Sequence, residues 1–125
     1  MLFEAHHIRS GECIAKEIEI AKTFFDRLVG LLGRFTIDAN YGLFFPGCRS
    51  IHTIFMKFSL DIIFLDKNMR ITKMISKMPP NRVAYGLFDT KNTLELLGGT
   101  LNNYVLKVGD QIALVERKSE DHDTK

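Results

Sequence analysis

The residues best suited to chemistry lie in one apolar stretch between positions 48 and 66. Cys48, His52 and Met56 follow each other at intervals of four, and Lys57 and Asp61 come shortly after. Burying such a group without a partner costs roughly 2–7 kcal/mol for a neutral polar group and more for a charge. We therefore expect these side chains to find partners, to face a cleft or to take part in a reaction.

Two kinds of chemistry can be weighed from these residue types. Cysteine, histidine and methionine are soft ligands that suit copper, but every fourth residue of an extended strand lies about 13 Å from the last. A nucleophilic Cys48 with His52 as its base would need a helix N-terminus or cationic neighbours to lower the thiol pKa. Arg49 is adjacent, but Cys48 follows the turn Pro46-Gly47 and not a helix start. We therefore expect Cys48 and Met56 to fill the core, and predict neither a metal site nor a cofactor.

The charged residues allow two interpretations. Lys57 and Asp61 would form an ion pair if a bend at 58–59 brings them together, and they would otherwise line the floor of a charged pocket. Arg27 and Arg34 flank a predicted helix and can receive an anion or the carboxylate of Glu95. Glycine-rich phosphate loops, serine-histidine-aspartate order and paired catalytic carboxylates are absent from the sequence. The predicted ligand-binding residues are Arg27, Arg34, His52, Met56, Lys57, Asp61 and Glu95.

The elements that must position these residues are mostly strands. Alternating apolar and polar residues predict a half-buried strand at 12–21, and helical spacing after Thr23 predicts one helix at about 23–32. A short helical turn is expected near 100–105, with Thr100 as its cap. Further strands are expected at 2–8 (an edge strand), 42–45, 50–57, 60–65, 70–76, 93–97 and 111–115, with a weak one within 81–92. The prediction is a mainly β fold, either a β-sandwich or a partly open barrel.

Composition limits the class of protein. The chain has 125 residues, of which 46% are hydrophobic, and a formal net charge of +2 with scattered basic residues. This predicts a single domain at 1–116 with a frayed charged tail at 117–125, and it disfavours nucleic-acid binding. No run is long and apolar enough for a membrane span, and the first ten residues lack a signal core. Two cysteines are too few for a disulfide framework, so a cytoplasmic location is expected.

Several motifs taken together resemble a known family. They are the run from Arg27 to Arg34 (RLVGLLGR), the strand 42–45 (GLFF), the segment 52–57 (HTIFMK) with 60–66 (LDIIFLD) behind it, Leu94-Glu95-Leu96 before Gly98-Gly99, and Val108-Gly109-Asp110. The combination is similar to the bacterial and archaeal family called domain of unknown function 192, an uncharacterised ancient conserved region. The resemblance covers about residues 10–115. It implies a compact, sandwich-like β domain with an early helix, and it implies no reaction.

Three functional hypotheses follow. The first is a small non-enzymatic binding or accessory module, whose ligand is a small molecule or a protein. The second is a hydrolase-like or anion- or sugar-processing enzyme that uses His52 as acid or base, which requires a carboxylate or nucleophile within about 3 Å. The third is a structural or partner-binding domain, including a homodimer, for which an exposed apolar patch would be the sign.

Overall fold

The computed structural model describes residues 1–21 and 37–117. These residues form a mainly β fold, as predicted. In chain order the elements are β1 (Phe3–His7), β2 (Cys13–Ile20), β3 (Tyr41–Phe45), β4 (Ser50–His52), β5 (Leu60–Leu65), β6 (Ile71–Met78), β7 (Val83–Tyr85), β8 (Asn92–Leu97), the 3-10 turn η1 (Thr100–Asn103) and β9 (Ile112–Glu116).

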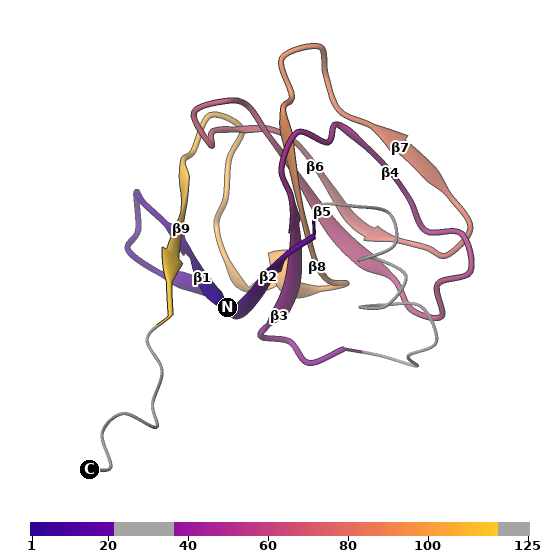
Figure 1. The fold of residues 1–125 in the computed structure, drawn as a ribbon, viewed down its shortest axis with the longest axis horizontal. Helices are drawn as coiled ribbons and strands as arrows, with labels where there is room; N and C mark the ends of the chain where they lie inside the picture. The colour runs from indigo at the N-terminus through magenta and orange to yellow at the C-terminus, as the bar shows by residue number, and fades with distance from the viewer. Residues whose placement is uncertain (22–36, 118–125) are drawn as a thin grey trace.

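Seven strands make one curled sheet in the order β6-β5-β8-β3-β2-β1-β9, and β4 pairs with β7 in a separate ribbon (Figure 1). The two edge strands of the sheet meet through a bridge between Arg70 and Gln111, which we call the seam. There the amides of Ile71 and Ile112 donate across to backbone carbonyls at 2.8 and 2.9 Å. The sheet is therefore a half-barrel joined at one place, which confirms the expectation of a partly open barrel.

One pair of neighbours in the sheet, β2 and β3, is parallel, and the other pairs are antiparallel. A parallel pair needs a crossover of a dozen residues or more, and the connection here runs through residues 21–40. The helix predicted at 23–32 falls in this connection and lies outside the described residues.

Two hydrophobic cores lie on the two faces of the sheet, one beneath the β4–β7 ribbon and one inside the half-barrel. Strand β5 serves both. Leu60, Ile62 and Phe64 pack beneath the ribbon, whereas Ile63 and Leu65 pack inside the half-barrel. Because both faces are covered, β5 is apolar at nearly every position instead of alternating, and all of its residues are buried.

The strand predictions are confirmed in most places, and three details are corrected. The strand at the N-terminus is not an edge, because β1 pairs with both β2 and β9. The strand expected at 50–57 ends at His52. The short helical turn is confirmed as η1, but its cap is Gly99, and the Thr100 hydroxyl donates instead to the carbonyl of Leu97 at 2.7 Å.

Among the helices of the described residues, none has the length and apolar character needed to cross a membrane.

Candidate functional site

The segment 53–56 is a turn held in place by Thr53, which is fully buried. Its hydroxyl donates to the carbonyl of Pro79 at 2.7 Å and accepts from the amide of Arg82 at 2.9 Å. Its own amide donates to the carbonyl of Arg82, and its carbonyl accepts from the amide of Asn81, both at 2.8 Å. These four bonds anchor the turn to residues 79–82 and end strand β4, which explains why the predicted strand stops at His52.

Within this turn, Phe55 points outward in an unusual backbone conformation. Its φ of 68° is in the left-handed region, which a bulky residue adopts only when its surroundings enforce it. The side-chain oxygen of Asn81 accepts from the Phe55 amide at 3.1 Å. Met56, the next residue, is buried in the core beneath the ribbon. The turn therefore anchors itself through Thr53 and Met56 and presents Phe55, which is 76% exposed.

Phe55 is bonded through its amide to Asn81, just before β7, and β7 carries further exposed apolar side chains. Val83 and Tyr85 face outward from this strand while Ala84 faces the core, as strand alternation requires. Phe88, in the turn after β7, is 87% exposed. We call this surface the apolar row, and it consists of Ile54, Phe55, Val83, Tyr85, Leu87 and Phe88. The ribbon that carries its central part lies on the opposite side of the fold from β1 and β9 (Figure 1).

Asp61 is fully buried inside the half-barrel and holds three backbone segments together. Its Oδ1 accepts from the amides of Lys77 at 2.7 Å and Gly99 at 3.0 Å, and its Oδ2 accepts from the amide of Leu101 at 2.7 Å. The carboxylate thus ties the end of β6 and the turn after β8 to β5. Lys57, its expected partner, is exposed.

The remaining predicted site residues do not gather around Asp61. Glu95 is buried, and it lies opposite Ile62 in the β5–β8 register while Asp61 lies opposite Leu96. Residues directly opposite each other in register share a face of the sheet, and successive residues of one strand point to opposite faces. Glu95 therefore shares the face of Ile62, and Asp61 points to the other face. His52 is half-buried and lies opposite Val83 in the ribbon, next to the apolar row. Arg27 and Arg34 lie outside the described residues.

Both cysteines are free thiols. Cys48 is partly buried against the core beneath the ribbon and donates to the carbonyl of Ser50 at 2.9 Å, as expected for a core filler. Burial, and after it the charge of Glu4, raises the pKa of the Cys13 thiol. A raised pKa keeps a thiol protonated at neutral pH and disfavours a role as nucleophile.

The structure brings together a serine, a histidine and an aspartate that the sequence analysis did not connect. The buried ring of His7 lies 2.8 Å from Ser10 Oγ through Nδ1 and 2.8 Å from Asp110 Oδ2 through Nε2. Since a carboxylate only accepts, Nε2–H donates to Asp110. Arg9 also binds this carboxylate, at 2.7 Å from Nη2 and 3.2 Å from Nε. Strand alternation in 3–7 places His7 inward, but sequence offers no sign that positions 7 and 110 meet.

We interpret this group as a structural link between two turns. The Arg9 guanidinium neutralises the carboxylate that His7 binds, and Ser10 Oγ already accepts from the amide of Glu12 at 3.1 Å. The hydrogen bonds from Arg9, and after them those from His7 and the Lys107 amide, hold the pKa of the Asp110 carboxyl well below its usual range against the opposing effect of burial.

This shift predicts an acid-dependent contribution of Asp110 to stability. A carboxyl whose pKa is lowered by folding stabilises the protein fully above its unfolded pKa of about 3.9, and that contribution is lost as pH falls toward the folded pKa. We expect the difference in free energy of unfolding between the parent and Asp110→Asn to be constant from neutral pH to about pH 5 and to shrink below about pH 4. Urea denaturation at each pH measures it.

The matched control is Arg9→Met, which removes the largest cause of the lowered pKa. In that background the effect of Asp110→Asn should depend less on pH. A difference between parent and Asp110→Asn that stays unchanged down to about pH 3 would contradict the prediction.

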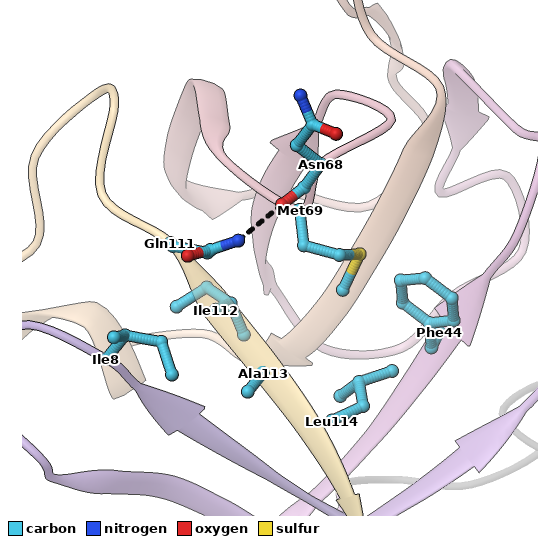
Figure 2. Close-up of a pocket in the computed structure, with 8 residues that line it drawn as sticks. All are labelled: Ile8, Phe44, Asn68, Met69, Gln111, Ile112, Ala113 and Leu114. Atoms are coloured by element: carbon cyan, nitrogen blue, oxygen red, sulfur yellow. Dashed lines mark hydrogen bonds between the residues drawn. The ribbon is translucent and has the colours of Figure 1, made fainter.

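A hollow of about 500 Å³ lies on the side of the fold away from the ribbon. Figure 2 shows the apolar side chains that surround it and the hydrogen bond from Gln111 Nε2 to the Asn68 carbonyl, 2.9 Å, above it. None of the predicted site residues that the structure describes lines it. Its walls are Ile8, Phe44, Asn68, Met69, Gln111, Ile112, Ala113 and Leu114.

Known proteins resemble this chain over most of its length. The model of the family described as Uncharacterized ACR, domain of unknown function 192, matches residues 5–114. A UPF0127 protein of Thermococcus sibiricus is 32% identical over 108 residues, covering 82% of this chain and 68% of the relative.

Two crystal structures share the fold. One is a protein of unknown function from Novosphingobium aromaticivorans, with a TM-score of 0.73, 22% identity, and coverage of 89% of this chain and 82% of that one. The other is a putative transcription regulator from Sinorhizobium meliloti, with a TM-score of 0.74, 19% identity, and coverage of 90% and 91%. At these identities the likeness concerns the fold alone.

Proposed function

We propose that this chain, which belongs to the uncharacterised family of domain of unknown function 192, is a non-enzymatic module. It binds a protein partner through the apolar row. Among the described residues, nothing supports the alternative of a hydrolase with His52 as acid or base. The function of the family itself is unknown.

The observation that carries the proposal is the exposure of Phe55. Phe55 is 76% exposed and has a positive φ, so both its lack of burial and its strained backbone are unfavourable in the folded chain. Backbone strain of this kind clusters at binding sites. The row continues with Tyr85 and Phe88, which are 66% and 87% exposed. Exposed apolar side chains on neighbouring elements favour an interaction surface, and aromatic residues are enriched at the centres of protein interfaces.

The other predicted site residues take supporting places in this proposal. His52 and Lys57 flank the turn that carries Phe55 and form part of the polar rim of the surface. Met56 anchors that turn from below. The roles of Arg27 and Arg34, and their pairing with Glu95, stay predictions, as does the cytoplasmic location.

Photo-cross-linking tests the proposal because it captures a protein that contacts the row inside the cell. A benzophenone amino acid placed at position 55 or 88 of the full chain, in its native cells, should give a discrete protein adduct on irradiation. The yield should fall at least ~10-fold when Tyr85→Ser is added, because Tyr85 is an exposed aromatic residue of the same row and such residues dominate binding. An adduct at twice the mass of the chain would identify a second copy as the partner.

The matched control places the same group at Ile8, which is 53% exposed beside the hollow. Adducts from position 8 and none from 55 or 88 would move the binding surface to the hollow and reject the proposal. Adducts from the row that persist at full yield with Tyr85→Ser would also reject it, because they would then report chance contact.

A further inference from the structure

We propose that Glu4, His6 and Cys13 form a binding site for a divalent transition-metal ion of the zinc class. One ligand atom from each side chain, a carboxylate oxygen, an imidazole nitrogen and the sulfur, lie within 4.8 Å of one another. This cluster is on β1 and the start of β2, apart from the apolar row, and the proposal does not depend on the proposed partner.

The fold places the three ligands on one face of two paired strands. Glu4 and His6 are two residues apart on β1 and therefore project to the same side. Cys13 lies directly opposite His6 in the antiparallel pairing. The register of this pairing shifts between Phe3 and Ala5 and again between Ala5 and His6. Such irregularities re-aim side chains and occur next to functional sites, and here they bring Cys13 level with His6.

The distances suit a small metal ion. Zinc bonds of about 2.0–2.3 Å in a tetrahedral site put neighbouring ligand atoms roughly 3.3–3.7 Å apart. His6 Nε2 and Glu4 Oε1 are 2.9 Å apart. Small side-chain rotations that move each atom by a few tenths of an ångström would open room for the ion. Cys13 Sγ donates weakly to the carbonyl of Ala15 at 3.4 Å, and metal binding would release the proton of that thiol.

The ligand types and exposure indicate which ion fits. Thiolate and imidazole select Zn²⁺ and its neighbours in the first transition row over Mg²⁺ and Ca²⁺, which prefer oxygen ligands. The side chains of His6 and Glu4 are 31% and 30% exposed. A fourth coordination position therefore faces solvent, as in zinc sites with three protein ligands and a bound water.

Cobalt spectroscopy on the untagged, metal-free full chain tests the site. Titration with Co²⁺ should produce the visible bands of a tetrahedral ion and a near-ultraviolet thiolate-to-cobalt charge-transfer band, both saturating at one ion per chain. Zn²⁺ should abolish these bands by competition, and Mg²⁺ should leave them unchanged. Cys13→Ser should remove the charge-transfer band, and His6→Ala and Glu4→Gln should each weaken Co²⁺ binding at least ~10-fold.

Cys48→Ser and His52→Ala are the matched controls, because they remove the other thiol and a half-buried histidine elsewhere in the fold. Both should keep the full spectrum. The proposal is overturned if the parent chain shows no charge-transfer band at millimolar Co²⁺, or if the band depends on Cys48 and not on Cys13. Far-ultraviolet circular dichroism of each variant separates loss of the ligand from loss of the fold.

Discussion

Replacing Asp61 with alanine should lower the free energy of unfolding by about 3–5 kcal/mol, because it leaves buried backbone amides without their acceptor and each such donor costs roughly 1–3 kcal/mol. The amides belong to Lys77, Gly99 and Leu101, and Asp61 is fully buried, so bulk water does not replace the lost acceptor. Urea denaturation followed by circular dichroism measures the loss.

Two further variants make the result specific. Asp61→Asn keeps an oxygen for two of the amides but turns an NH₂ group toward Leu101, so we expect an intermediate loss of about 1–3 kcal/mol. Asp66 accepts from the amides of Asn68 and Arg70 in a partly exposed turn, and Asp66→Ala should cost only about 1 kcal/mol because water replaces it there. Equal losses of unfolding free energy for Asp61→Ala and Asp66→Ala would contradict the prediction that burial makes the loss of the acceptor at position 61 more costly.

Replacing Gly42 with alanine should destabilise the chain by about 3 kcal/mol, since the added methyl group has no room in the half-barrel. A Cβ at this position would lie 2.7 Å from the backbone oxygen of Glu95, 2.7 Å from Leu96 Cδ2 and 2.8 Å from Ile18 Cδ1. A backbone oxygen cannot rotate away as a side chain can, so β3 would have to separate from β8. Thermal and urea unfolding of Gly42→Ala measure the effect.

Gly47→Ala is the control that separates crowding from backbone strain. Nothing lies within 4 Å of a Cβ at Gly47, but its φ is 71°, so alanine there should cost about 1 kcal/mol from the left-handed conformation alone. If Gly42→Ala costs no more than Gly47→Ala, the close approach of β3 and β8 is not what requires glycine at position 42.

Local patterns in the sequence predict most of the strands because the chemistry that forms them is local. The continuous apolar run at 60–65 and the alternation at 12–21 each show, within the segment, which residues are buried. The turn at 66–68 is recognisable from the residue types that turns favour. The strand expected at 50–57 fails for a reason outside the segment. Thr53 bonds to residues 79–82, more than twenty positions away, and no pattern within 50–57 reveals that contact.

The candidate site shows the same division. Polar residues in apolar strands are correctly recognised as needing partners, and Asp61 has them. That these partners are backbone amides, and that Asp61 and Glu95 face opposite sides of the sheet, depends on strand pairing. Ser10 is a local neighbour of His7, but Asp110 meets His7 only because β1 pairs with β9. Such contacts arise from topology, which the spacing of residues along one chain does not encode.

The seam between Arg70 and Gln111 has a consequence for the motions of the fold. Every other boundary in the sheet is a ladder of several paired residues, but here one bridge and the amides beside it join the edges. Local unfolding begins where the fewest buried contacts and hydrogen bonds hold the structure. The two edges of the half-barrel should therefore separate transiently at the seam before any strand leaves the sheet. Ile71 and Ile112, buried behind the seam, would then be the first core residues to meet solvent, long before global unfolding.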